Sequence, residues 1–218
     1  PGVRHILVPK QTRSAPELLM SPEKCSPQIL DCLTEIARAA EARAESTAFH
    51  SEKVARVAHG IAKALDRPKE ILARLLVVGR LHNIGLVGTC DSVLLKTSKL
   101  TPQEFKHIQE HTRLGAALLA PIPELADVAE VCLSHHERWD GSGYPNGLAG
   151  QEIPRMARLI SVADAYCAMI SERPHRDSLP RPVAAEVITE ERGKQLCPEC
   201  VDGFLTWYKK TDGRIDLF

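Results

Sequence analysis

A pair of adjacent histidines followed by a glycine-rich turn restricts the fold of this chain more than any other segment. It occupies residues 133–150, LSHHERWDGSGYPNGLAG, with the pair at His135 and His136. Apolar residues precede the pair at helical spacing, which predicts that both histidines lie on the last turn of a helix ended by the WDG tripeptide. Adjacent helical residues point about 100° apart, so two imidazoles can face one cleft only from a helix end. Such a pair suits a divalent transition metal; the alternative is a helix C-terminus whose dipole favours cationic histidines.

The composition favours a helical core. Of the 218 residues, 44% are apolar and only 4% are aromatic, so Leu, Val, Ile and Ala must fill the core, as is typical of helical proteins. Basic and acidic residues number 28 each, and this zero net charge argues against a main role in gripping DNA or an anionic bilayer. No apolar run reaches about 18 residues, so membrane insertion is not predicted. Seven cysteines without framework spacing fit a reducing cytosol.

The chain is predicted to hold one helical domain at residues 26–210. An N-terminal tail or linker is expected at residues 1–25, where Pro9, Pro16 and Pro22 prevent a long element, and a C-terminal tail at residues 211–218. The first residue is Pro1 rather than methionine, which indicates a processed or excised piece. An upstream sensor or receiver region is the corresponding hypothesis.

Apolar spacing predicts the helices of this domain. The first helix is expected to bury a one-sided stripe made of Ile29, Leu30, Leu33, Ile36 and Ala40. Residues 67–82 are apolar on almost every side, which predicts a central, buried helix. Thr101 and Glu104 form a capping box that starts a further helix.

Several ionisable side chains fall where water is scarce. His50 lies one helical turn before an apolar position, and His82 ends the buried helix 67–82. Asp164 lies in the middle of another apolar helix, where a carboxylate is costly unless it is paired or bound to a metal. A backbone carbonyl is the alternative partner for each histidine.

Two further histidines, His107 and His111, are one helical turn apart. Either both chelate one ion, or one is a ligand and the other is solvated. The candidate ligands are therefore His50, His82, His111, His135, His136 and Asp164. Five imidazoles and one carboxylate are the inventory of a two-metal site of the Fe, Mn or Zn type.

These motifs resemble those of the HD-GYP family, the cyclic di-GMP phosphodiesterase branch of the HD superfamily. The matching segments are HSEKV at His50, HNIG at His82, the LKTSKLTPQEF run, the HHERWDGSGYPNGLAG segment and VADAY at Asp164. The resemblance covers about residues 47–205. It implies an all-α helical bundle of the HD superfamily with a glycine-rich GYP loop.

The resemblance also implies a chemistry. It implies two divalent transition metals, Fe or Mn in preference to Zn or Ni, and hydrolysis of cyclic di-GMP. One metal is expected at His50, His82 and Asp164, and the other at His111, His135 and His136. In the same scheme the catalytic positions are His82, Asn83 and Asp164.

Nucleotide binding is expected from Tyr144, Arg173 and Arg176, the last two in an ERPHR segment that matches an Arg-Pro-Tyr-Arg element of the family. Arginines would grip phosphate through forked, charge-assisted bonds. The resemblance further implies a bacterial, cytoplasmic protein with a cyclic dinucleotide as its ligand. Diguanylate cyclase (GGDEF) domains as protein partners, and a homodimer, are hypotheses of the same origin; DNA is not an expected partner.

Two positions at one corner of the expected site depart from the family pattern. Asn83 stands where the family has a metal-bridging aspartate, and Leu86 stands where it has a lysine. A neutral amide is a poor bridge between two cations, which repel by about 4 kcal/mol per unit-charge pair at 4 Å and an effective dielectric near 20. The prediction is impaired activity and partial metal occupancy. The alternative is a catalytically degenerate domain that binds a nucleotide or a protein and signals without chemistry.

A separate pair of cysteines, Cys197 and Cys200, has CxxC spacing. Structural zinc needs four ligands, and no second pair at suitable spacing exists. The segment is therefore predicted to be an ordinary helix start rather than a zinc module.

Overall fold

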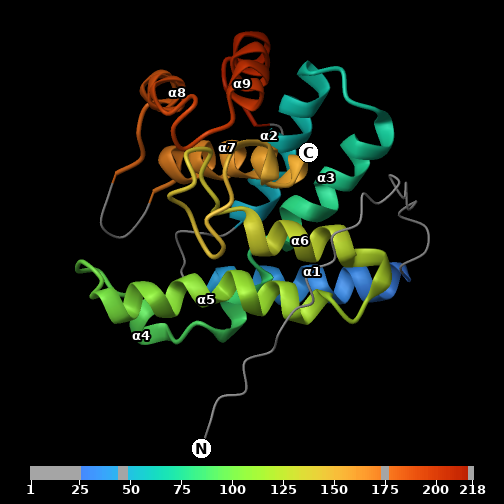
Figure 1. Cartoon of the computed structure of the whole chain (residues 1–218), viewed down its shortest axis with the longest axis vertical. Coiled ribbons are helices and arrows are strands. Elements are labelled where there is room, and N and C mark those ends of the chain that lie inside the picture. Colours follow the sequence, from blue (N-terminus) through green and yellow to red (C-terminus); the bar gives the residue numbers. More distant parts are fainter. Residues whose placement is uncertain (1–25, 44–48, 173–176, 216–218) are drawn as a thin grey trace, which may run out of the picture.

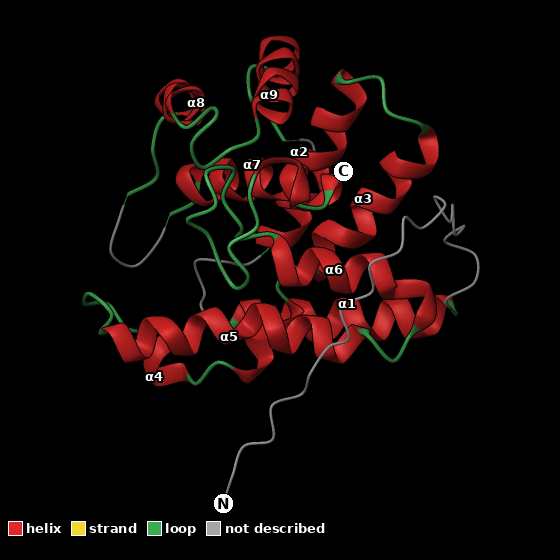
Figure 2. Ribbon diagram, viewed as in Figure 1, coloured by secondary structure: helices red, strands yellow, loops and turns green. Residues whose placement is uncertain are grey.

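The computed structural model describes residues 26–43, 49–172 and 177–215. Over these residues the chain is built from helices joined by short loops, which confirms the all-α prediction (Figures 1 and 2). The predicted tail at 1–25 and the two nucleotide-binding candidates Arg173 and Arg176 lie outside the described residues.

The elements follow one another as α1 (Pro27–Ala42), α2 (His50–Ala64), α3 (Lys69–Leu81), η2 (Ile84–Gly88), α4 (Asp91–Leu94), α5 (Pro102–Leu119), η3 (Pro123–Leu125), α6 (Ala126–Ser134), η4 (Gly150–Glu152), α7 (Arg155–Ile170), α8 (Arg181–Glu190) and α9 (Pro198–Thr211). In Figure 1, α5, α6 and α7 succeed one another across the molecule, with α8 and α9 beyond α7. The predicted capping box at the start of α5 is confirmed, because Thr101 and Glu104 exchange both hydrogen bonds.

Helix α3 buries most of its C-terminal half, in part as its apolar surface predicts, while its first residues, Lys69 and Glu70, are exposed. It packs against α1, α2, α6 and α7. The stretch Lys69–Gly88 is long and apolar enough by composition to cross a membrane, but 50% of the relevant window is buried inside the bundle, as expected of a core helix. Helices α2 and α3 approach closely at Gly79, where an added Cβ would collide with the backbone of Ala55.

The buried face of α1 agrees with the predicted stripe at Leu30, Leu33 and Ala40 and differs from it at the two isoleucines. Ile29 is 46% exposed and Ile36 is 39% exposed, while Ala37, Ala40 and Glu41 are buried. The helix lies on α3 and on η2, where small side chains permit a close approach. The inward face is therefore determined by the close packing of small residues, and it includes the carboxylate of Glu41 at its end. The spacing of apolar residues alone could not predict either feature.

The C-terminal helix α9 ends at Thr211, one residue past the predicted domain limit. Beyond it, the buried Tyr166 hydroxyl donates a hydrogen bond of 2.9 Å to the carbonyl of Gly213. The first residues of the predicted tail are thus attached to α7.

The turn η2 must approach α5 closely, and Gly85 makes this possible. A Cβ at this position would collide with the backbone carbonyl of His111 and the amide of Gly115. We expect Gly85→Ala to lower the free energy of unfolding by about 1–3 kcal/mol, because neither backbone can yield. Urea unfolding followed by circular dichroism measures this change.

Gly88→Ala in the same turn is the matched control. Its added Cβ would meet only the end of the Leu114 side chain, which can rotate away. We expect a change below about 1 kcal/mol. Equal losses in the two variants would contradict the close approach of η2 to α5.

Candidate metal centre

The six predicted ligands converge in two groups of three. His50 at the start of α2, His82 just after α3 and Asp164 in the middle of α7 have ligand atoms within 4.8 Å of one another. The elements that bring them together are far apart in the chain but packed against one another, since α2 contacts both α3 and α7.

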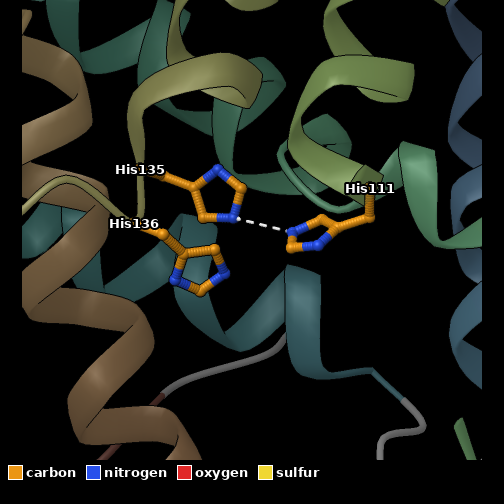
Figure 3. Close-up of side chains that lie close together, drawn as sticks. All are labelled: His111, His135 and His136. Carbon is orange, nitrogen blue, oxygen red and sulfur yellow. Dashed lines mark hydrogen bonds between the residues drawn. The ribbon is translucent and has the colours of Figure 1, made fainter. Parts of the chain in front are cut away.

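The second group is formed by His111 of α5 with His135 and His136 at the end of α6, again with ligand atoms within 4.8 Å. Figure 3 shows the three rings facing a common centre. The ring centroids of His82 and His135 are 5.1 Å apart, so the two groups are neighbours. The partition of the ligands into two triplets is the one that the family resemblance implies.

Backbone carbonyls fix the orientation of three of these imidazoles. The Nδ1 atoms of His82, His111 and His135 lie 2.7, 2.6 and 2.9 Å from the carbonyl oxygens of Gly79, Ile108 and Cys132, each three residues earlier. A carbonyl can only accept, so each Nδ1 carries the proton and each Nε2 is left with a free lone pair. This is the arrangement that holds metal-ligating histidines in place.

These Nε2 atoms need a cation. Nε2 of His82 is buried and has no hydrogen-bond partner in the described part of the chain. The Nε2 atoms of His111 and His135 face each other at 3.3 Å, marked by the dashed line in Figure 3. Two lone pairs at this distance repel unless a positive group lies between them. The residues therefore fit a divalent ion better than a set of core histidines satisfied by the backbone.

Burial keeps the imidazoles neutral and ready to ligate. It is the main cause that lowers the pKa of His82, His111 and His135, and it lowers the pKa of His136 to about 3. Burial opposes ionisation of Asp164, but the hydrogen bond from His50 at 2.8 Å and the electrostatic effect of the surrounding imidazoles together outweigh it and hold the pKa of this carboxyl well below its usual range. The site combines neutral nitrogen donors with an anionic oxygen.

The prediction that both paired histidines lie on the last helical turn is wrong in detail. Helix α6 ends at Ser134, so His135 is its C-cap and His136 lies beyond it. The two ring centroids are 4.1 Å apart. Leaving the helix frees the second ring from the rotation of about 100° that would separate adjacent helical side chains.

The structure also decides between the two possibilities for the histidines of α5. His107 lies apart from both triplets, and its Nε2 accepts a hydrogen bond of 3.2 Å from the backbone N–H of Cys90. Only His111 faces the centre, so the two residues do not chelate one ion together.

The glycine-rich loop covers one side of the centre. The ring of Tyr144 stacks on His136 with centroids 4.9 Å apart and an angle of 27°. The buried carboxylate of Glu137 holds the loop by accepting hydrogen bonds from the amides of Asn146 and Leu148 at 2.7 and 3.0 Å. Burial raises the pKa of Tyr144, so its phenol stays protonated and can donate.

Two buried carboxylates near the centre were missed by the sequence interpretation. One is Glu137, inside the recognised HHE segment. The other is Glu41 of α1, which accepts hydrogen bonds from the amide and hydroxyl of Ser51 and lies 3.5 Å from Nδ2 of Asn83. A glutamate one residue after Ala40, on the small-residue face of α1, was the available signal.

The contact between Glu41 and Asn83 orients the side-chain amide of Asn83, which stands at the family's metal-bridging position. A carboxylate only accepts, so Nδ2 must face Glu41 and the carbonyl oxygen Oδ1 remains the only atom of this amide able to contact a cation. The negative charge of Glu41 also partly opposes the effect of burial, the main cause that lowers the His82 pKa.

Comparisons with known proteins agree with this site. A family model described as HD domain matches residues 34–199. The cyclic di-GMP phosphodiesterase of Thermotoga maritima is 37% identical over 187 residues, which are 84% of this chain and 49% of the relative. The cyclic di-GMP phosphodiesterase response regulator RpfG of Xanthomonas campestris is 36% identical over 190 residues, 86% of this chain and 50% of the relative. The chain thus spans about half the length of the curated relatives it matches.

Solved structures share the fold. A cyclic GMP-AMP specific phosphodiesterase of V. cholerae (V-cGAP3) has a TM-score of 0.63 and 18% identity, covering 84% of this chain and 49% of that one. The HD domain of the L. monocytogenes phosphodiesterase PgpH, in complex with cyclic-di-AMP, has a TM-score of 0.59 and 18% identity, covering 84% and 99%. At such identities the likeness concerns the fold alone.

The helical bundle and the matched family model define the class: the chain belongs to the HD domain family. Within that family, its relatives and the HHERWDGSGYP segment make it a member of the HD-GYP type. The resemblance seen in the motifs is confirmed.

The buried imidazoles predict how stability depends on pH. In the unfolded chain a histidine titrates near pH 6.5, whereas the folded-state pKa of His136 is about 3. Below pH 6.5 the unfolded state therefore binds more protons, and the free energy of unfolding falls as the pH decreases toward 3. We expect the urea midpoint of metal-free protein to fall between about pH 7.5 and about pH 5.5.

The variant His136→Gln removes one titrating ring and should flatten this dependence, while the two proteins should have similar slopes above about pH 7.5. Parallel pH profiles for the two proteins down to about pH 4 would show that His136 is not held neutral in the folded state.

Proposed function

We propose that this chain is a metal-dependent phosphodiesterase domain that hydrolyses cyclic di-GMP, with activity impaired at the corner occupied by Asn83. The observation that carries the proposal is the convergence of two ligand triplets with buried, cation-ready donor atoms. Membership of the HD-GYP type and relatives named as cyclic di-GMP phosphodiesterases support the substrate class. Other relatives are named for 3'3'-cGAMP, so this cyclic dinucleotide is the competing substrate.

Two divalent ions, Fe or Mn in preference to Zn or Ni, would be held by the two triplets. His50, His82 and Asp164 would hold one ion, and His111, His135 and His136 would hold the other. When bound, such ions act as Lewis acids toward phosphate and make water a stronger nucleophile at neutral pH.

The chain itself supplies binding and orientation. The carbonyl contacts at Nδ1 keep the imidazoles aimed inward without a cost of reorganisation. Tyr144 stands over His136 with a protonated hydroxyl, placed to donate to a phosphate oxygen. Phe105 is 48% exposed and lies edge-on to Tyr144 at 6.2 Å, offering a nucleobase a face to stack on. Arg173 and Arg176 remain candidates for phosphate binding.

Impairment follows from the charge at position 83. An amide adds no negative charge between two cations, and only its Oδ1 is free to contact one. The nearby carboxylate of Glu41 is engaged by Ser51 at the start of α2. At the family's lysine position, Leu86 brings no cation to a phosphate.

The same observations favour a second candidate function. A domain that holds no metal pair, because the bridging charge is missing at position 83, would have no turnover and would bind a cyclic dinucleotide or a protein and signal by occupancy. Diguanylate cyclase (GGDEF) domains and a second copy of the chain are the partners proposed for that function.

Metal content separates the two functions. We expect protein purified anaerobically with Mn(II) or Fe(II) to carry more than one and up to about two ions per chain. His50→Ala and His111→Ala should each remove one ion by emptying a different triplet, as measured by elemental analysis. His107→Ala is the matched control and should keep the wild-type content, because this ring lies outside both triplets. Protein without metal after this preparation supports the binding domain.

Turnover tests the impaired corner. We expect Asn83→Asp to raise hydrolysis of cyclic di-GMP at least about tenfold, which corresponds to about 1.4 kcal/mol in the barrier. The product is followed by chromatography with Mn(II) or Fe(II) present, and 3'3'-cGAMP is assayed in parallel. The exposed Asn146 provides a charge-matched control, since Asn146→Asp adds the same charge outside the triplets. Wild-type turnover equal to that of Asn83→Asp would reject the impaired-site proposal.

A further inference from the structure

The cysteine pair that zinc does not explain has a defined place in the fold. Cys197 is the N-cap of α9 and Cys200 is the third residue of its first turn. Residues three apart in a helix have Cα atoms about 5 Å apart, within the range that a disulfide spans. The spacing at this helix start is therefore compatible with a disulfide between the two thiols.

The surroundings of Cys197 favour a thiolate. The thiol of Cys200 is a neighbour of the Cys197 sulfur, and Nη1 of Arg158 on α7 lies 3.9 Å from the same sulfur. These two groups, with Cys200 having the largest effect, lower the pKa of Cys197 to about 6 although burial opposes them. A helix N-terminus and a neighbouring cation are the usual conditions of a reactive cysteine.

Arg158 supplies an independent observation. Its Nε atom is buried without a hydrogen-bond partner in the described part of the chain, and its guanidinium lies 5.9 Å from the ring centre of Trp139. Among the described residues, the polar side-chain contact of its guanidinium is with the sulfur of Cys197. The sulfur of Cys197 is therefore the anionic group that this cation has nearby.

The other buried cysteines differ. Burial raises the pKa of Cys132 to about 12 and raises that of Cys167 well above its usual value. The only groups of three or more potential metal ligands among the described residues are the two triplets of the metal centre. Neither includes Cys197 or Cys200, so the pair has too few partners for structural zinc.

We propose that Cys197 and Cys200 form a reversible intramolecular disulfide, a redox site separate from the metal centre, with hydrogen peroxide as the oxidant. The Cys197 thiolate attacks one peroxide oxygen, so that an S–O bond forms, the O–O bond breaks and hydroxide leaves. The Cys200 sulfur then attacks the Cys197 sulfur, so that the S–S bond forms and the S–O bond breaks. Water leaves with the thiol proton, and the two electrons of the dithiol have reduced peroxide to two waters. A dithiol reductant reverses the reaction.

Access to this pair depends on the size of the reagent. Cys197 is 3% exposed and Cys200 is 2% exposed, and an exposed turn at residues 192–194 precedes them in the chain. Local opening of such a turn admits a small oxidant more readily than an aromatic disulfide reagent. For each reagent, the rate at the pair is divided by the rate at the exposed Cys90. We expect this ratio to be larger for peroxide than for the aromatic disulfide reagent.

The segment that precedes the pair also holds the glycine-rich loop. The amides of Trp139 and Asp140 donate to the carbonyls of Gln195 and Lys194 at 3.0 and 2.9 Å. Oxidation at Cys197 removes the anion beside Arg158, which also lies against Trp139. Formation of the disulfide would therefore change the contacts that hold the glycine-rich loop. An effect on turnover rests on the proposed function, whereas formation of the disulfide does not.

Mass spectrometry tests the disulfide directly. Full-length protein is treated with peroxide, alkylated and digested with trypsin, which releases residues 195–209 as one peptide holding both cysteines. We expect this peptide to be lighter by two hydrogens and to carry no alkyl group, and a dithiol to restore two alkyl groups. The peptides of Cys132 and Cys167 should remain alkylated throughout.

Variants separate the roles of the two thiols. In Cys200→Ser, a sulfenic acid should persist on Cys197 and be trapped by a 1,3-diketone, whereas Cys197→Ser should give no adduct on Cys200. Arg158→Met should slow alkylation of Cys197 at neutral pH several-fold, and Arg158→Lys, which keeps the charge, should restore most of the rate. A peptide that stays in the dithiol form while Cys90 is oxidised, or zinc bound by the reduced pair, would overturn the proposal. None of these readouts depends on the metal centre or on hydrolysis.

Discussion

The metal centre depends on one type of hydrogen bond, from a histidine Nδ1–H to a backbone carbonyl, which occurs three times. The imidazoles of His82, His111 and His135 each donate Nδ1–H to the carbonyl three residues earlier, so each ring is fixed in one tautomer with Nε2 directed inward. Burial removes the protonated form of these rings as a competitor. What remains is a set of lone pairs that the protein alone leaves unsatisfied, and this requirement for a cation links the fold to the proposed chemistry.

The rest of the bundle maintains this geometry through close packing and buried carboxylates. Gly79 allows α3 to approach α2, and Gly85 allows η2 to approach α5. These two close contacts flank His82 and fix its position in the metal centre. Glu137 fixes the glycine-rich loop, and Glu41 joins the start of α2 to Asn83. A buried carboxylate is stable only when its hydrogen bonds are satisfied, so these two residues also make the arrangement specific.

Much of this was accessible from the sequence because its signals are local. Capping at Thr101, the apolar surface of α3 and the spacing of the ligands each depend on a few neighbouring residues. The errors have a common origin in packing between elements. One error is the buried face of α1, and the other is the end of α6 before His135. The choice between His107 and His111, which the sequence left open, likewise depended on tertiary contacts. The redox pair is a similar case, since the CxxC spacing is local but Arg158 comes from another helix.

The sequence by itself determined that the chain is helical, which motifs it carries and which side chains could ligate a metal, since periodicity, capping and spacing are written in consecutive residues. Only the tertiary structure decided that the six ligands divide into two triplets in space, that Asn83 faces Glu41 and that Arg158 lies beside Cys197. These facts depend on which helix faces bury one another. That choice is made by the packing of the whole core, and no single segment encodes it.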